Sequence, residues 1–356
     1  MYSKNEIKFF LGSNTKRGFV SLFEQLRDPE NGYRLYILKG GPGSGKSSLM
    51  RRVAKYMEGN GHYVEYIPCA SDPESLDAIL DYDGKTAMVD GTAPHTLDPK
   101  YPGAYDTIIN LGDAWDQNVL FQNRQRIIEL SDKISQYHSM ATSSITAAAI
   151  LLDCNRTMAK AYVNHSSVQK FEQNLAKELK DSASGQEHKR LLSAVSVGKT
   201  VFFDDTMMAL CPKLYVISDN WGAASDLLLS NLRDLALTKN LDVITCYCSI
   251  HNLGKIDHLL FPSARIGVTT ANSFHSTSCK TYISIDELMY PIETADLDIM
   301  TNYLSTAQHL IETASDHVAS AKQLHDKLEA FYIEAMDFSK VDIIFNGIVN
   351  DMLHKE

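Results

Sequence analysis

The residue types with the clearest chemistry form a glycine-rich stretch that fits the spacing Gly-x-x-x-x-Gly-Lys-Ser. Glycines let a backbone curl so that successive N–H groups point at phosphate oxygens, and a following helix adds the positive end of its dipole. In this pattern Lys46 reaches the terminal phosphates and the Ser47 hydroxyl ligates Mg²⁺. The stretch therefore predicts a nucleoside triphosphate site, with ATP and Mg²⁺ as expected cofactors, built from Gly40, Gly41, Pro42, Gly43, Ser44, Gly45, Lys46, Ser47 and Ser48.

A carboxylate follows the next conspicuous apolar segment. Asp90 ends the run Thr86-Ala87-Met88-Val89. An apolar strand that ends in an acid, downstream of a phosphate-binding loop, is typical of the Walker B arrangement, in which the acid holds Mg²⁺ directly or through water. We expect Ser47 and Asp90 to form the metal site, and Lys46 and Asp90 to be the main catalytic residues.

Two further residues are catalytic candidates that also have simple structural explanations. His95 follows Asp90 in a segment dense in turn formers, at the end of a predicted strand where ligands bind in open α/β sheets. It could orient an attacking water, or it could only hydrogen-bond the loop. Asp72 also follows a predicted strand and could act as a base, although capping of a helix explains it equally well.

The elements that must position these residues alternate between strands and helices. Apolar runs at residues 34–39, 62–69 and 85–90 predict strands, and four-residue spacing of apolar side chains predicts a helix from Lys46. Residues 71–74, Ser-Asp-Pro-Glu, are typical of another helix start. Strands that alternate with helices in short units predict a mostly parallel α/β sheet.

The chain then becomes helical, and afterwards the first pattern returns. Apolar residues spaced three and four apart predict a long helix from about Ile127, with a second helix packing back on it, and a further helical region near the C-terminus. Between them Leu214-Tyr215-Val216-Ile217 repeats Leu35-Tyr36-Ile37-Leu38. We therefore expect an α/β fold of two tandem P-loop-like units, each followed by a helical hairpin or bundle, with boundaries at 1–115, 116–185, 186–292 and 293–356.

The second copy lacks the phosphate-binding residues. A direct alignment sets Gly222 opposite Gly43 and replaces the lysine by Ser225, the Mg²⁺-binding hydroxyl by Asp226, and Asp90 by Thr270. Carboxylates at Asp219 and Asp226 would repel a polyphosphate, so we predict a structural partner that does not bind nucleotide. His275 falls opposite His95, and its presence in a copy without the phosphate loop favours a structural role for both histidines.

Composition narrows the function classes. The chain has 356 residues, of which 44% are hydrophobic and 22% charged, which is typical of a globular protein, and its net charge of −10 argues against nucleic acid as a partner. The apolar run near residues 145–152 is too short to span a bilayer, and the N-terminus lacks the apolar core of a signal peptide. Six scattered cysteines predict neither a disulfide framework nor a zinc site. We expect a cytoplasmic protein without a membrane partner.

The segments GGPGSGKSS, PCASDPESLD and MVDGTAPHTLDPKYPGAYD resemble a family of uncharacterised bacterial tandem P-loop proteins, described generically as ATPases or nucleotide kinases. The resemblance covers most of the chain, and DGTAPH is its most specific part. It implies a P-loop fold and ATP binding, without a defined substrate. In that family the second half usually carries its own GKS/T loop, which is missing here.

Three functions fit these observations. An ATPase needs only Lys46, Ser47, Asp90 and a positioned water. A small-molecule or nucleotide kinase would pass the γ-phosphate to an unidentified acceptor, although the lack of arginine between Arg52 and Arg124 disfavours a nucleotide acceptor. A non-enzymatic module could use ATP as a switch for a protein partner that contacts the helices. We predict Mg²⁺-dependent ATP hydrolysis at the single N-terminal site.

Overall fold

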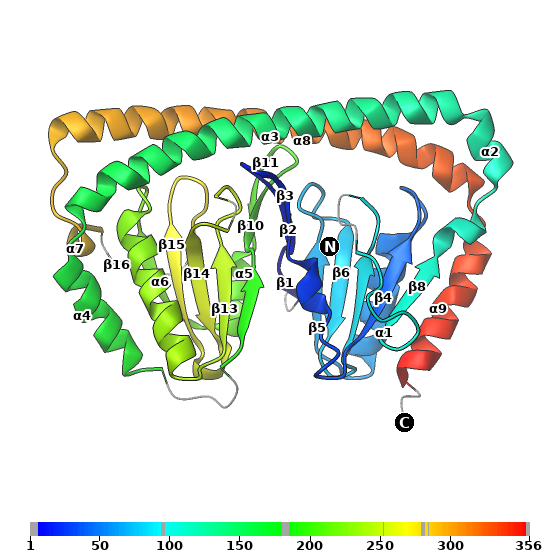
Figure 1. Cartoon of the computed structure of the whole chain (residues 1–356), viewed down its shortest axis with the longest axis horizontal. Coiled ribbons are helices and arrows are strands. Elements are labelled where there is room, and N and C mark those ends of the chain that lie inside the picture. The colour runs from blue at the N-terminus through cyan, green and yellow to red at the C-terminus, as the bar shows by residue number, and fades with distance from the viewer. Residues whose placement is uncertain are drawn as a thin grey trace. The chain divides into compact units, whose positions relative to one another are not determined.

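The computed structural model describes residues 6–93, 97–179, 185–251, 253–278, 282–283 and 285–353. The chain divides into two compact units. Unit 1 comprises residues 1–12, 21–140 and 317–356, and unit 2 comprises residues 13–20 and 141–316. Each unit contains one six-stranded sheet together with helices, so the fold is mixed α/β (Figure 1).

The sheet of unit 1 has the strand order β1-β5-β6-β7-β4-β8. The strands are β1 (Ile7–Lys8), β4 (Arg34–Lys39), β5 (Val64–Pro68), β6 (Leu76–Asp81), β7 (Thr86–Asp90) and β8 (Asp106–Asn110). β4 lies in parallel between β7 and β8, and β1 is parallel to β5. β6, however, runs antiparallel to both β5 and β7. The strands expected at 34–39, 62–69 and 85–90 are confirmed. The sheet is mostly parallel, as expected, with β6 as its one antiparallel strand.

The helix predicted from residues 71–74 is wrong. The backbone N–H of Ser75 donates to the carbonyl of Asp72 in a turn (2.9 Å), and the chain continues directly into β6. Asp, Pro and Ser favour turns as strongly as they favour helix starts, so these residues alone do not separate the two. Every residue of β6 is buried, which makes it an inner strand held by tertiary packing.

Helix α1 (Lys46–Gly59) confirms the helix predicted from Lys46 and packs on this sheet. Leu49, Val53 and Met57 belong to its buried face. Helix α9 (Phe338–Leu353) packs against α1 and adds Val341 and Ile348 to the same core. This core fixes the first turn of α1, and with it the residues that follow the glycine-rich loop.

The sheet of unit 2 has the order β16-β12-β15-β14-β13-β9. Its strands are β9 (Glu187–Arg190), β12 (Lys213–Ser218), β13 (Val243–Tyr247), β14 (Ile256–Phe261), β15 (Ile266–Ala271) and β16 (Tyr282–Ile283). Read from β9 to β16, it reproduces the order and every strand direction of unit 1. A register irregularity in β5 at Ile67/Pro68 also has its counterpart in β13 at Cys246/Tyr247. The two sheets therefore share one topology.

The helical regions lie where the sequence predicted them, but the first is arranged differently. Helix α3 (Arg124–Ala159) is one uninterrupted helix of 36 residues, so the alanine-rich segment near Ala148 continues the helix that carries Ile127 instead of packing back on it. Periodicity describes a helix face and contains no signal for where a helix turns back. α8 (Thr294–Ala335) has 42 residues, and its stripe from Met300 to Val318 is buried as expected.

The remaining elements are short. They comprise α2 (Gln117–Gln122), α4 (His165–Ala176), α5 (Asp204–Leu210), α6 (Ala223–Thr238), α7 (Ile285–Leu288), the 3₁₀ helices η1 (Phe23–Leu26), η2 (Leu111–Ala114), η3 (Lys160–Tyr162) and η4 (Pro262–Ala264), and the strand pairs β2 (Gly12–Thr15) with β3 (Gly18–Ser21) and β10 (Ser193–Ser196) with β11 (Lys199–Phe202). Of these, α6 matters most for function, because it follows the second copy of the loop.

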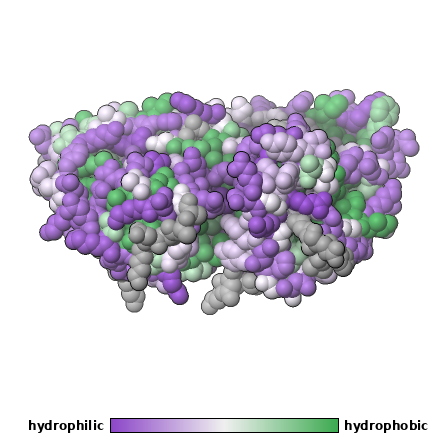
Figure 2. All heavy atoms as spheres, turned by 60° about the horizontal axis from the view of Figure 1, so that its bottom comes forward, coloured by the Kyte–Doolittle hydropathy of each residue, from purple (hydrophilic) through white to green (hydrophobic). Residues whose placement is uncertain are grey.

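None of the described helices combines the length and apolar character that a bilayer crossing demands. On the face drawn in Figure 2, hydrophilic side chains cover most of the surface and hydrophobic ones lie between them in small groups. The five cysteines within the described residues are free thiols, as their spacing predicted.

Candidate functional site

The glycine-rich loop (residues 40–45) joins the end of β4 to the start of α1. Gly43 and Gly45 have φ values of +71° and +87°, a left-handed conformation that glycine adopts without strain. The Ser44 hydroxyl donates to the Gly41 carbonyl (2.8 Å) and closes the curl from inside. The loop thus has the strand–curl–helix geometry that the motif requires, and Lys46 is the first residue of the helix.

Lys46 spans the loop and the neighbouring strand. Its ammonium donates to the carbonyls of Gly40 (2.7 Å) and Gly41 (2.9 Å) and lies 3.6 Å from Asp90 Oδ2. Only 10% of the Lys46 side chain and 15% of the Asp90 side chain are exposed. The structure therefore brings together two of the four predicted catalytic residues. Since the carbonyls of Gly40 and Gly41 are neutral, an incoming phosphate can displace them from the ammonium at modest cost.

Ser47 and Asp90 each have an atom engaged by a neighbour. The backbone N–H of Leu76, at the start of β6, donates to Ser47 Oγ (2.9 Å). Asp90 Oδ1 accepts from the backbone N–H (2.9 Å) and the hydroxyl (2.5 Å) of Thr92, which leaves Oδ2 facing Lys46. Oxygen donors of this kind suit Mg²⁺. Ser47 lies on α1 and Asp90 at the end of β7. The ammonium of Lys46, the neighbour of Ser47 on α1, lies next to Asp90 and so links the two elements.

Asp77 is a candidate that sequence reasoning missed. It is the second residue of β6 and is only 5% exposed. The register pairs Ala78 with Val89, and extended by one residue it sets Asp77 opposite Asp90. Opposed residues of antiparallel strands point to the same face with their Cβ atoms about 4.5–5.5 Å apart. The signal in the sequence is the apolar run Ala78-Ile79-Leu80 between two acids, Asp77 and Asp81, which the predicted helix concealed.

The glycine after Asp90 is required by packing. A Cβ on Gly91 would lie 2.4 Å from Ile37 Cγ2 on β4. The Lys39 ammonium, at the end of β4, donates to the carbonyls of Gly91 (2.7 Å) and Leu97 (3.1 Å). β4 and β7 therefore leave the sheet side by side, and this keeps Asp90 next to the glycine-rich loop.

No described contact brings the other two catalytic candidates, Asp72 and His95, to Lys46 and Asp90. Asp72 accepts from the Ser75 hydroxyl (2.9 Å) and lies 3.3 Å from the Lys322 ammonium on α8. Its capping of a helix is ruled out together with the helix itself. His95 lies outside the described residues. Ser48 is exposed on α1.

Part of α8 lies against the outside of the loop. A Cβ on Gly41 would come within 2.5 Å of the Tyr332 ring, and one on Gly43 within 2.8 Å of the Glu329 carbonyl. The Tyr332 ring meets Trp115 edge to face, with centroids 5.8 Å apart. These glycines thus have a packing role in addition to their conformational one, because only a hydrogen fits between the loop and the helix.

The corresponding loop of unit 2 is shorter than the direct alignment assumes. Gly222, with φ +74°, immediately precedes α6, just as Gly45 immediately precedes α1. Four residues separate β12 from α6, whereas six separate β4 from α1. Gly222 therefore corresponds to Gly45 rather than Gly43, and Ala223 rather than Ser225 takes the place of Lys46. An alignment without gaps could not reveal this deletion.

Unit 2 places its own carboxylate at the start of the helix. Asp219 Oδ1 accepts from the backbone N–H groups of Trp221 (2.9 Å) and Gly222 (2.8 Å), and Oδ2 accepts from that of Ser225 (3.0 Å). Asp219 is 2% exposed. An acid in this position satisfies the N–H groups and the positive helix end that a phosphate would otherwise use.

A small pocket of about 40 Å³ lies beside this loop, and it is lined by Asp219, Trp221, Cys248, His251, Lys255, Asp257 and His275 among others. Small-molecule sites usually measure several hundred Å³, so this pocket has room for a few waters or an ion but not for a nucleotide. Burial and the nearby Lys255 lower the pKa of His251 to about 4. Burial likewise raises the pKa of Cys248 to about 12, so its thiol is not a nucleophile near neutral pH.

Comparison with known proteins gives no match: no family model, no curated protein and no solved structure corresponds to this chain.

Proposed function

We propose that the protein binds ATP at the glycine-rich loop of unit 1 and hydrolyses it with the help of Mg²⁺. The observation that carries this proposal is the position of Lys46, which begins α1 and lies 3.6 Å from Asp90 at the end of the neighbouring parallel strand. A lysine at a helix start beside a strand-terminal acid is the arrangement that phosphate-binding loops use to hold a triphosphate and its metal.

In this proposal each part of the site has a separate role in binding or hydrolysis. The backbone N–H groups of the loop and the first turn of α1 bind the β- and γ-phosphates. The Lys46 ammonium moves from the Gly40 and Gly41 carbonyls to the phosphate oxygens and neutralises charge there. Ser47 Oγ and Asp90 Oδ2 are the oxygens that fit Mg²⁺, which when bound would polarise the γ-phosphate. Asp77, opposite Asp90, would orient the attacking water and accept a proton from it.

Unit 2, in this proposal, is a degenerate copy of the same unit. Its sheet has the same topology, but Ala223 stands where Lys46 would be, and Asp219 satisfies the helix start. A single competent site per chain follows.

Phosphate release from MgATP by the full chain, without an added acceptor, tests the proposal. Sustained release that requires Mg²⁺ supports hydrolysis, and Asp90→Asn should reduce it about 10- to 100-fold. Turnover only after addition of an acceptor would favour the kinase alternative. Nucleotide binding without turnover would favour an ATP-dependent switch, and failure to bind any nucleotide would refute all three.

A further inference from the structure

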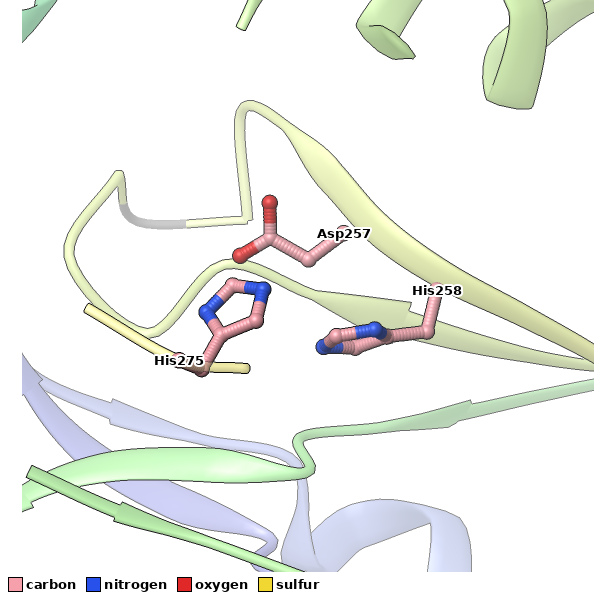
Figure 3. A group of neighbouring side chains, drawn as sticks. All are labelled: Asp257, His258 and His275. Carbon is pink, nitrogen blue, oxygen red and sulfur yellow. The ribbon is translucent and has the colours of Figure 1, made fainter. Parts of the chain in front are cut away.

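Outside the proposed nucleotide site, the strongest concentration of chemistry lies in unit 2. Asp257 and His258 are neighbours near the start of β14, and His275 follows β15. They are 2%, 0% and 7% exposed, and one donor atom of each lies within 4.8 Å of the others. Figure 3 shows the Asp257 carboxylate and the His258 ring converging on the His275 ring. Two imidazoles and one carboxylate are a common donor set for divalent transition metals.

The hydrogen bonds of His258 leave one ring nitrogen free to act as a ligand. The Thr269 hydroxyl lies 2.6 Å from His258 Nδ1 and gives its own proton to the Thr270 carbonyl (3.3 Å). When the hydroxyl oxygen accepts from Nδ1–H, Nε2 carries the lone pair that a metal ion needs. Among the described residues His258 Nε2 has no hydrogen-bond partner, although it is fully buried. A second bond that fixes the tautomer in this way is typical of metal-binding histidines.

His275 is held similarly. Its Nε2 lies 2.9 Å from the Thr270 hydroxyl and 3.5 Å from Asn272 Nδ2. Its ring lies 4.9 Å from that of His258, measured between centroids. Burial lowers the pKa of both imidazoles, so both are neutral near pH 7. Neutral imidazole is the form that binds a metal.

The ionised state of Asp257 also suits a cation. Although burial acts to raise the pKa of Asp257, the ammonium of Lys255 and the nearby imidazoles hold it well below its usual range, so the carboxylate is ionised. Lys255 forms an ion pair with Asp257 and lies close to Asp219 as well. With Arg156, which also lines the pocket, the two carboxylates face two cations, so the negative charge that would hold a metal ion comes from Asp257 itself.

We propose that Asp257, His258 and His275 bind one divalent transition-metal ion, with zinc as the expected ion. Asp257 and His275 also line the 40 Å³ pocket, so a water in that pocket can fill the remaining coordination position. Zinc–ligand bonds of about 2.0–2.2 Å require the three donors to close in by small side-chain rotations. The proposal concerns unit 2 alone and is independent of nucleotide binding by unit 1.

The test uses the full chain, stripped of metal by a chelator and then dialysed against micromolar Zn²⁺. We expect one zinc per chain by elemental analysis. His258→Gln and His275→Gln should each weaken zinc binding at least about 100-fold. The matched control is His251→Gln, because His251 is a buried histidine of the same pocket that lies outside the cluster; this variant should keep wild-type stoichiometry. Absence of tight zinc binding by the wild type, or wild-type zinc affinity in either cluster variant, would overturn the proposal.

A measurement on the wild-type protein guards against variants that fail to fold. X-ray absorption of the zinc-loaded chain should show two imidazoles, oxygen donors and no sulfur. A spectrum with sulfur ligation, or with fewer than two imidazoles, would place the zinc elsewhere and refute the assignment.

Discussion

The loops after β4 and β12 make the most informative comparison in the molecule. β4 and β12 occupy equivalent positions in their two sheets. Each loop enters its helix through a glycine with a left-handed backbone, Gly45 in unit 1 and Gly222 in unit 2. The N–H groups of a helix start need an anion or another acceptor. Unit 2 supplies its own carboxylate, Asp219, whereas unit 1 has a lysine beside its helix start. The N–H groups at the start of α6 thus have an acceptor within unit 2, whereas those at the start of α1 could donate to an external phosphate.

The two units also differ in the residue that lies opposite the acid on β6 and on β14. By topology Asp257 on β14 is the counterpart of Asp77 on β6. In unit 1 the residue opposite Asp77 is Asp90, while in unit 2 the residue opposite Asp257 is Thr270. A pair of acids suits a hard ion such as Mg²⁺, and an acid among histidines suits zinc. Two exchanges, Thr270 in place of Asp90 and His258 in place of Ala78, therefore change the ion that the frame favours.

The largest effect should come from Lys46→Gln. We expect ATP hydrolysis to fall by about 10²–10³-fold, because the ammonium that contacts the loop carbonyls is removed. Ser225→Ala is the control, since Ser225 lies in the first turn of α6, the counterpart of α1, and its buried hydroxyl has no partner among the described residues. Phosphate release measures both variants. Full activity of the lysine variant, or loss of activity in the serine variant, would contradict the assignment of the nucleotide site to the loop of unit 1.

Acid should unfold unit 2 before unit 1. His251 has its pKa lowered from 6.5 to about 4 by burial and by Lys255. The unfolded chain therefore binds more protons between these values, and the stability of unit 2 declines as the pH falls from about 6.5 to 4, by about 3 kcal/mol.

The two tryptophans can report this difference, because Trp115 lies in unit 1 and Trp221 in unit 2. Denaturant titrations of Trp115→Phe and Trp221→Phe at several pH values would follow each unit by fluorescence. We expect the Trp221 signal to lose stability first and His251→Gln to reduce that loss. A pH dependence that is equal for both tryptophans would contradict the prediction.

Asp219→Ala should destabilise unit 2 by about 2 kcal/mol, because three backbone N–H groups lose their acceptor. Asp219→Asn keeps one acceptor oxygen and should cost less. Trp221 fluorescence during urea unfolding measures both. We expect ATP hydrolysis to be unchanged in either variant, and a marked fall in hydrolysis would mean that the second loop takes part in the reaction.

The smallest predicted effect concerns Asp77. Asp77→Asn should reduce hydrolysis about tenfold and raise the Mg²⁺ concentration needed for half-maximal rate. Glu65→Gln serves as the control, since Glu65 is a buried acid of the same sheet that accepts a hydrogen bond from Tyr82 (2.6 Å). If both substitutions shift the Mg²⁺ dependence equally, Asp77 does not act together with Asp90 at the Mg²⁺ site.

Much of the candidate site could be predicted from the sequence. The loop from Gly40 to Ser47, the strand before it and the helix after it are set by neighbours in the chain, and so is the strand that ends at Asp90. Turn geometry, helix starts and strand propensity act over a few residues, which is why a motif reveals them. The internal repeat was visible for the same reason, because Leu214–Ile217 forms its strand locally just as Leu35–Leu38 does.

Tertiary structure alone decided the rest. β6 is a strand because an inner position between β5 and β7 buries both of its faces, and no local signal in residues 71–76 requires it. That pairing sets Asp77 opposite Asp90 and, in unit 2, brings His258 and His275 together across β14 and β15. The close approach of Tyr332 to Gly41 joins residues nearly three hundred positions apart. Register and burial depend on which distant segments pair, and the free energy that selects those pairs belongs to the whole core.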